Sequence, residues 1–309
     1  MKIAVVGPGA MGSLFAAFLT RSKAKHDVWI LDKDADRAKK LDANGIIVEG
    51  SSNFTQKINA TTDPKKIDIC DLVIIFTKSY DTEKALSSIK PMLGEKTNVL
   101  SLQNGLGNLQ LICDAVGEDR AVGGIAICGA ILERAGKVKV IGKPEIIIGR
   151  LSGKIFGELR HISTLFNEAG IPAKISKDIN GVIWSKLIIN VGINAIASIC
   201  RLKNGALLEY EGARELMRQA VVEATKVAKR KRIKLIYDDP LQKVESICSE
   251  TSDNICSMLQ DIMRSQPTEI DFINGAIIRQ GKSSGVKTPV NEILTQLIKS
   301  VEASYKKQV

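Results

Sequence analysis

One short turn in this 309-residue sequence has the residue types and spacing that phosphate binding requires. The turn is "GPGAMG", which follows the apolar segment "KIAVV" and precedes a segment of helical composition. In a turn of this kind Gly7 permits a tight bend, Gly9 lets a pyrophosphate approach the backbone, and Gly12 lets the helix pack closely on the strand. We expect the turn to bind a dinucleotide. The alternative is a glycine-rich turn between strand and helix that holds no ligand.

The first helical residues, Ala10 and Met11, complete the expected phosphate site, because the N–H groups at a helix N-terminus attract anions. An acidic residue is expected about 20 residues further on, and Asp32 in "WILDKD" occupies that place. Its carboxylate would bind the ribose hydroxyls and repel a 2′-phosphate, which favours NAD over NADP. Lys33 and Arg37 lie near enough to receive that phosphate if Asp32 turns away. The sequence leaves this choice open.

A polar stripe marks the apolar segment "WSKLIINVGINAI" at 184–196. Lys186, Asn190 and Asn194 are spaced four residues apart, and each such step turns a helix face by only about 40°. The three side chains therefore lie on one face among aliphatic neighbours. A stripe this narrow favours the lining of a polar cavity, and the alternative is a solvated helix edge.

Two further polar residues follow apolar strands. Lys78 follows "LVIIFT" and Asn104 follows "VLSLQ", so both are expected just past the carboxyl ends of parallel strands, where open α/β sheets bind ligands. Asn104 has a second interpretation, because Asn-Gly is above all a turn-forming pair.

The order of expected elements predicts an α/β fold with two domains. Short apolar strands alternate with helical segments over the first 110 residues, which is typical of a parallel sheet covered by helices. Glycine-separated strands at 122–150 indicate an antiparallel extension, and a helix at 156–170 and a strand at 172–176 complete a Rossmann-type, doubly wound domain over residues 1–176. Residues 177–309 are expected to form an all-helical substrate domain, with a ligand in the cleft between the two. Its helices are predicted at 179–199, 211–232, 240–263, 267–279 and 290–305.

The helix expected at 267–279 determines the setting of Glu269. Pro267 lacks an N–H and suits the first position of a helix, with Ser265 as the N-cap. Glu269 then lies in the first turn, where a carboxylate can simply complement the helix dipole.

Composition excludes several other classes of protein. The formal charge of +10 favours anionic ligands, but the basic run "KVAKRKRIK" ends a helical pattern without interleaved aromatic residues, so we expect no nucleic-acid partner. Six cysteines without CxxC spacing and two histidines make a metal site or a Ser-His-Asp triad improbable. The N-terminus is already a strand rather than a signal peptide, and no uninterrupted apolar stretch reaches about 18 residues. A cytoplasmic protein without a membrane partner is expected.

With these residues in view, the sequence resembles the ketopantoate reductase (2-dehydropantoate 2-reductase) family over nearly its whole length. The matching segments are "GPGAMGS", "TKSYDT", "QNGLGN", "WSKLIINVGINAI", "SDNICSMLQDI", "PTEIDFINGAII" and "GVKTPVNE". The resemblance implies a Rossmann domain joined to a helical domain. It also implies NADPH-dependent reduction of ketopantoate to pantoate, a step towards pantothenate and coenzyme A.

The same resemblance implies roles for individual residues. Lys186 would be the general acid, and Glu269 would assist at the ketone and hydroxyl end of the substrate and beside the cofactor. Asn190 and Asn194 would bind the substrate hydroxyl, Ser257 and Asn104 its carboxylate or the cofactor end, and Lys78 would lie near the cofactor. One departure is Asp32, because the family commonly has a basic residue there to hold the 2′-phosphate.

Two alternatives to a ketopantoate reductase follow from these residues. A related enzyme could reduce another 2-oxo acid, and NAD(H) could replace NADP(H) as its cofactor. A protein of a different class could bind NAD(P) as a redox sensor without turnover, although a pure binder needs no proton donor such as Lys186. The apolar helical domain would also permit a homodimer.

Overall fold

The computed structural model describes residues 1–307, which divide into two compact units. The first unit comprises Met1–Gln103 and Asn108–Ile179, and the second comprises Asn104–Gly107 and the chain from Asn180 onward. The expected domain boundary at 176/177 lies three residues before Asn180. The sequence pattern did not predict that residues 104–107 belong to the second unit.

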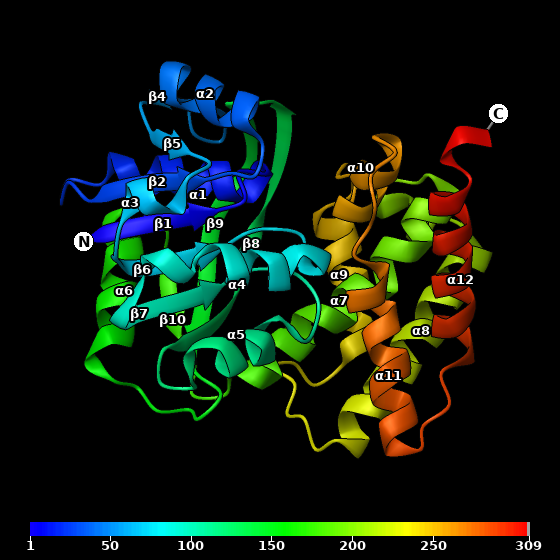
Figure 1. The fold of residues 1–309 in the computed structure, drawn as a ribbon. Helices are drawn as coiled ribbons and strands as arrows, with labels where there is room; N and C mark the ends of the chain where they lie inside the picture. Colours follow the sequence, from blue (N-terminus) through cyan, green and yellow to red (C-terminus); the bar gives the residue numbers. More distant parts are fainter. Residues whose placement is uncertain (308–309) are drawn as a thin grey trace. The chain divides into compact units, whose positions relative to one another are not determined.

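The first unit is built on a ten-stranded sheet in the order β4-β3-β9-β8-β7-β6-β1-β2-β5, with β10 paired to β9 (Figure 1). The strands are β1 (Lys2–Val6), β2 (Asp27–Leu31), β3 (Ile46–Gly50), β4 (Phe54–Gln56), β5 (Asn59–Thr61), β6 (Cys70–Ile75), β7 (Leu93–Ser101), β8 (Ala121–Arg134), β9 (Lys137–Gly149) and β10 (Ala173–Ile175). The helices are α1 (Ala10–Arg21), α2 (Ala35–Asn44), α3 (Pro64–Ile67), η1 (Ser79–Asp81), α4 (Thr82–Ser88), η2 (Lys90–Met92), α5 (Asn108–Val116) and α6 (Gly157–Glu168).

The strand order places the glycine turn where an α/β sheet binds ligands. β1 lies between β2 and β6 and is parallel to both, so the chain leaves β1 at the point where the strand order reverses. Strands β8 and β9 pair antiparallel from Gly123–Gly149 to Arg134–Lys137, which confirms the predicted antiparallel extension. The short edge strands β3, β4 and β5 and the helix α5 were not predicted.

Helix α1 connects the glycine turn to the core of this unit. Its residues Leu14, Phe15 and Leu19 are fully buried, and the Phe15 ring contacts Phe76 and Phe166 at centroid distances of 4.9 and 6.0 Å. Each buried aliphatic or aromatic side chain of this kind contributes about 1.5–3 kcal/mol. The packing fixes the start of α1, and with it the turn that precedes the helix.

In the described part of the second unit, every regular element is a helix. The helices are α7 (Ile179–Cys200), η3 (Gly205–Leu208), α8 (Glu211–Arg230), α9 (Pro240–Glu250), α10 (Ser257–Met263), η4 (Ile270–Phe272), α11 (Asn274–Ser284), α12 (Pro289–Ala303) and η5 (Tyr305–Lys307). Helix α7 is long and apolar enough to cross a membrane, but 72% of its most apolar window is buried inside the protein. It is therefore the core helix of this unit.

Two predicted helices of this unit have different limits. The helix expected at 240–263 is interrupted, because "TSDNIC" (251–256) forms a turn in which the Asn254 N–H donates to the Thr251 carbonyl at 2.9 Å. The prediction of a helix that begins at Pro267 is wrong. Ser265 has a φ of +51° and ends α10 instead of capping a new helix, and the chain stays irregular up to η4. Glu269 is consequently the residue before η4, and α11 begins only at Asn274.

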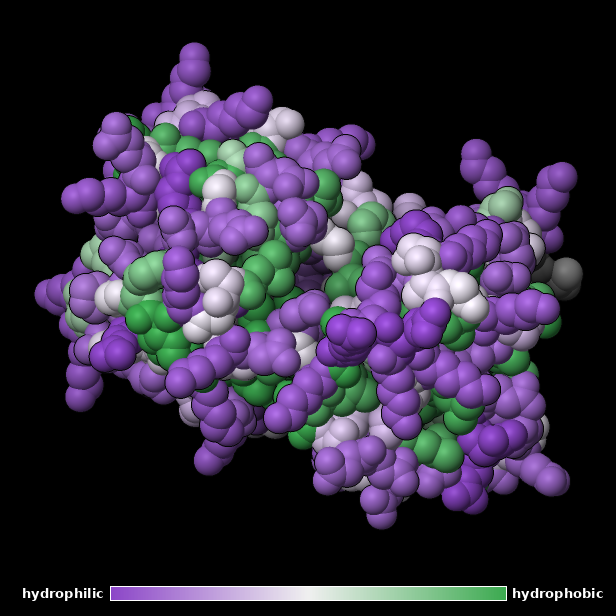
Figure 2. All heavy atoms as spheres, turned by 90° about the horizontal axis from the view of Figure 1, so that it is seen from below, coloured by the Kyte–Doolittle hydropathy of each residue, from purple (hydrophilic) through white to green (hydrophobic). Residues whose placement is uncertain are grey.

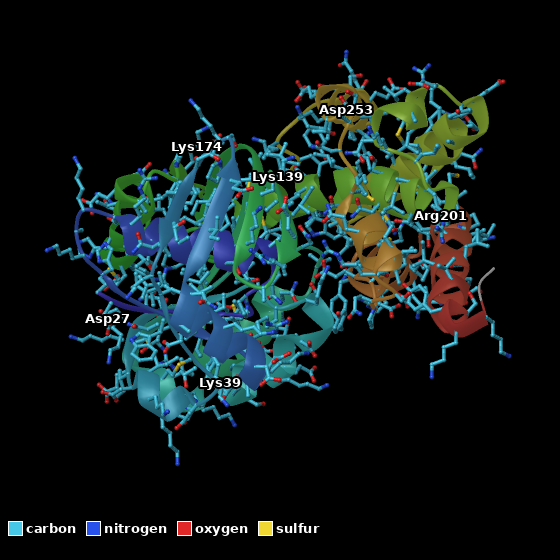
Figure 3. All side chains as sticks on the ribbon, turned by 90° about the horizontal axis from the view of Figure 1, so that it is seen from above. Asp27, Lys39, Lys139, Lys174, Arg201 and Asp253 are labelled. Atoms are coloured by element: carbon cyan, nitrogen blue, oxygen red, sulfur yellow. The ribbon has the colours of Figure 1, made fainter. Side chains whose placement is uncertain are left out.

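Charged side chains lie at the surface of both units. On the face drawn in Figure 2, hydrophilic residues cover most of the surface and apolar residues form patches between them. Figure 3 shows exposed charged residues on separate elements, among them Lys39 on α2, Lys174 on β10 and Arg201 after α7. The charged groups of these three residues are therefore solvated.

Candidate active site

The glycine turn has the geometry that its sequence predicts. Gly7 has a φ of +89°, and a Cβ there would lie 2.8 Å from the Thr77 nitrogen. A Cβ on Gly12 would lie 2.1 Å from the Gly7 carbonyl oxygen. A Cβ on Gly9, by contrast, would meet no atom of the described residues within 4 Å. Protein packing therefore requires Gly7 and Gly12, whereas Gly9 borders open space into which a pyrophosphate can fit.

The start of α1 offers donors beside that space. Ala10 and Met11 are the first residues of the helix, and its N-cap, Gly9, has no side chain that could accept their hydrogen bonds. The first N–H groups of an α-helix have no acceptor within the helix and are available to a phosphate. The turn and the helix start together fit a dinucleotide.

Asp32 lies one residue beyond β2 and is held by three hydrogen bonds. The Arg37 guanidinium donates to both carboxylate oxygens at 2.5 and 2.6 Å, and the Asp34 N–H donates to Oδ1 at 3.1 Å. Asp32 is only 3% exposed, and its hydrogen bonds raise the pKa of Arg37. Lys33 forms an ion pair with Asp81, in which the Lys33 Nζ lies 2.8 Å from a carboxylate oxygen. Turning Asp32 away, as a 2′-phosphate would require, therefore breaks a bidentate ion pair.

Lys78 lies close to the glycine turn, because Thr77 packs directly on Gly7. A buried amide, Gln103, holds this loop to the end of β7. Its Nε2 donates to the Thr77 carbonyl at 2.9 Å and to Thr82 Oγ1 at 2.8 Å. The Thr82 hydroxyl in turn donates to Asn108 Oδ1 at 2.8 Å. Sequence reasoning missed this network, although a glutamine directly before the Asn-Gly pair was a usable signal.

The segment that carries Asn104 packs on the helical unit. The Leu106 N–H donates to the Phe272 carbonyl at 3.0 Å, and a Cβ on Gly105 would lie 2.6 Å from that same oxygen. Since Glu269 directly precedes η4 and Phe272 ends it, Asn104 and Glu269 belong to neighbouring segments of one unit. The carbonyl of Glu269 accepts the Phe272 N–H at 2.9 Å, which fixes this short turn.

The polar stripe of α7 is partly to fully buried. Lys186 and Asn190 are half-buried, and Asn194 is only 4% exposed. The Asn194 Nδ2 donor is buried and has no hydrogen-bond partner within residues 1–307. Such a group is destabilising unless water or a ligand supplies an acceptor. A solvated helix edge does not account for a donor buried in this way, and a buried water or a bound ligand would supply its acceptor.

Two other segments of the unit are bonded to α7 beside the stripe. The Cys256 thiol donates to the Asn194 carbonyl at 3.7 Å, and Asn274 Nδ2 donates to the Val191 carbonyl at 3.5 Å. Ser257 follows Cys256 as the first, exposed residue of α10. Glu269, five residues before Asn274, is 5% exposed. The second unit thus brings the segments of Asn104, Ser257 and Glu269 to or near the helix of Lys186.

Among residues 1–307, no group of three or more His, Cys, Asp or Glu side chains could hold a metal ion. The stripe itself carries an ammonium, Lys186, a type of group that suits proton transfer.

The fold and the glycine turn define an NAD(P)-dependent oxidoreductase. The family model described as "Ketopantoate reductase PanE/ApbA" matches residues 3–153, and its C-terminal counterpart matches residues 178–302. The chain belongs to the ketopantoate reductase family, as its motifs predicted.

Similar proteins extend over the full length of the chain. A 2-dehydropantoate 2-reductase of Aquifex aeolicus is 34% identical and covers 98% of this chain and 97% of its own. The corresponding protein of Pyrococcus horikoshii is 35% identical, with 98% of each chain covered. Among solved structures, D-mandelate dehydrogenase with NADH and anilino(oxo)acetate superimposes with a TM-score of 0.91 at 31% identity, covering 100% of each chain. A PanE/ApbA family ketopantoate reductase of Ralstonia eutropha also has a TM-score of 0.91, at 29% identity over 99% of this chain and 100% of that one.

Proposed function

We propose that this protein reduces ketopantoate (2-dehydropantoate) to pantoate and that it prefers NADH. The observation that carries the proposal is the buried Asn194 Nδ2, which has no hydrogen-bond partner within residues 1–307 and lies on the same helix face as Lys186. A substrate oxygen would supply the missing acceptor. Full-length similarity to 2-dehydropantoate 2-reductases at 34 and 35% identity supports the choice of substrate.

The reaction needs a proton donor where negative charge develops. The reduced nicotinamide supplies the hydride when it is bound. Lys186 hydrogen-bonds the ketone oxygen of the substrate and gives it a proton as the carbon is reduced, so that a hydroxyl forms and the lysine becomes neutral until solvent reprotonates it. Glu269 orients the ammonium and the new hydroxyl. Asn190 and Asn194 bind that hydroxyl, and Asn104 and Ser257 hold the substrate carboxylate.

The preference for NADH rests on the ion pair between Asp32 and Arg37. Its two short hydrogen bonds keep the carboxylate at the end of β2, where its negative charge repels a 2′-phosphate and its remaining lone pair would accept a hydrogen bond from a ribose hydroxyl. The 31% identical D-mandelate dehydrogenase structure contains NADH, which supports the same assignment. Lys78 and the N–H groups at the start of α1 would contact the phosphates.

The second candidate function is reduction of a different 2-oxo acid. It is favoured by the likeness to D-mandelate dehydrogenase, whose 31% identity is close to the 34% of a 2-dehydropantoate 2-reductase. Both reactions use the same proton donor, so Lys186 cannot distinguish them. The residues around the substrate side chain decide between a branched aliphatic and an aromatic group.

The test is the loss of nicotinamide absorbance at 340 nm with ketopantoate and, in parallel, with benzoylformate, the 2-oxo acid that corresponds to mandelate. Each substrate is measured with NADH and with NADPH. A kcat/KM at least about tenfold higher for ketopantoate with NADH supports the proposal, since tenfold corresponds to about 1.4 kcal/mol of discrimination. A higher value for benzoylformate establishes the second candidate. Dinucleotide binding without turnover of any 2-oxo acid would identify a sensor and overturn both.

A further inference from the structure

A short irregular segment between α8 and α9 lies across α7. We call residues 231–239 the strap. Its side chains alternate, with Ile233, Leu235 and Tyr237 partly buried and the intervening residues exposed. Ile233 and Leu235 pack against the core of the helical unit. Every second residue of the strap between Ile233 and Tyr237 is therefore partly buried, as in an extended strand with one buried face.

Two hydrogen bonds of the strap reach the same residue of α7. The Tyr237 hydroxyl donates to the Ser185 carbonyl at 2.6 Å, and the Ile236 N–H donates to Ser185 Oγ at 3.0 Å. The Ser185 hydroxyl donates in turn to the Gly181 carbonyl at 2.7 Å. Ser185 is 1% exposed and directly precedes Lys186.

The bond from Tyr237 differs from an ordinary helix contact. A carbonyl inside an α-helix already accepts the N–H four residues on, so the tyrosine bonds the second lone pair of Ser185. Burial raises the pKa of Tyr237, so the phenol keeps its proton and remains a donor at neutral and moderately alkaline pH. The result is a second, external support for the helical turn that carries Lys186.

We propose that Tyr237 is a positioning residue for proton transfer: its hydroxyl, acting through the Ser185 carbonyl, fixes the turn of α7 from which Lys186 reaches the ketone oxygen. The inference rests on the proposed function, because it takes Lys186 as the proton donor. Small errors in the placement of a reacting group are costly in rate, even when the fold is intact. The hydrogen bond from Tyr237 to Ser185, one residue before the proton donor Lys186, is suited to prevent such errors.

The first test is Tyr237→Phe in the full-length protein, which keeps the ring and removes only the hydroxyl. We expect kcat to fall roughly three- to tenfold, the rate equivalent of one ordinary hydrogen bond. The dissociation constant for NADH and the KM for the 2-oxo acid should stay within about twofold, since neither ligand contacts Tyr237 in this scheme. The matched control is Tyr305→Phe, which loses a similar bond, from the Tyr305 hydroxyl to the Gln266 carbonyl at 2.9 Å, outside the turn of α7 that carries Lys186. It should lower Tm without lowering kcat.

A second readout does not depend on turnover. The rate of reductive methylation at Lys186, followed by peptide mass spectrometry and compared with that at exposed Lys226, should change in Tyr237→Phe and stay unchanged in Tyr305→Phe. An unchanged rate at Lys186, or a Tyr237→Phe variant with a lowered Tm and wild-type kcat, would show that the strap only stabilises the fold and would overturn the inference. If the wild type turns over no 2-oxo acid, the proposed function fails, and the methylation rate still decides whether Tyr237 positions Lys186.

Discussion

The Arg37 guanidinium donates hydrogen bonds to both oxygens of the Asp32 carboxylate, at 2.5 and 2.6 Å, directly after strand β2. The pair joins a residue that favours NADH to one that could bind the 2′-phosphate of NADPH. The two functions exclude each other, because Arg37 cannot hold Asp32 and a phosphate in the same bidentate geometry.

Replacing Asp32 should therefore change the cofactor preference. In Asp32→Ser the repulsion is removed and Arg37 is released to meet a 2′-phosphate. We expect the ratio of kcat/KM for NADPH to that for NADH to rise by about 10- to 100-fold, or about 1.4–2.8 kcal/mol. Steady-state kinetics with both cofactors measure it, and the control is Lys39→Ser, at an exposed position on the same helix as Arg37, which should leave the ratio unchanged. An unchanged ratio would show that Asp32 does not face the ribose.

Substitutions at two glycines of the turn should affect cofactor binding and protein stability separately. In Gly9→Ala the new Cβ meets no atom of the described residues within 4 Å, so Tm should stay close to that of the wild type while NADH binding weakens at least about tenfold. In Gly12→Ala the Cβ would lie 2.1 Å from the Gly7 oxygen, which should cost about 1–3 kcal/mol of stability. Thermal melts and fluorescence titration with NADH check both. Equal losses of Tm in the two variants would contradict the assignment.

Removing the Lys186 ammonium should abolish proton donation and leave the first unit unaffected. We expect kcat of Lys186→Ala to fall by about 10²- to 10⁴-fold, with NADH affinity nearly unchanged. Lys186→Arg tests whether kcat depends on proton donation rather than on positive charge alone, because a guanidinium keeps the charge but does not release a proton near neutral pH. Its kcat should also stay low. Near-normal turnover in Lys186→Ala would remove this residue from the acid role.

Burial should determine which thiols react. Burial raises the pKa of both Cys70 and Cys248 to about 12, so only roughly one thiol in 10⁴ is ionised at pH 8. Cys200 is exposed. Brief treatment of the native protein with iodoacetamide at pH 8, followed by peptide mass spectrometry, should find Cys200 modified and the two buried cysteines intact. Unfolding in guanidinium should expose all three, and native labelling of Cys248 ahead of Cys200 would refute the burial argument.

The parts of this protein that were predictable from sequence are those encoded by neighbouring residues. The glycine turn, the strand before it and Asp32 lie within one β-α-β unit, where hydrophobic period and glycine spacing act locally. The antiparallel pairing of β8 and β9 also follows from adjacent segments. The polar stripe of α7 is visible for the same reason, because helical periodicity places Lys186, Asn190 and Asn194 on one face.

Tertiary structure decided whatever depends on partners distant in the chain. Asn104 is separated in sequence from the helical unit, and only the contact of its loop with Phe272 assigns it there. The turn at 251–256 and the late start of α11 override helical patterns, because the chain must bend to pack Cys256 and Asn274 on α7. The bond from Tyr237 to Ser185 spans 52 positions. No local pattern encodes such a bond, since its stability arises only when folding buries both partners together.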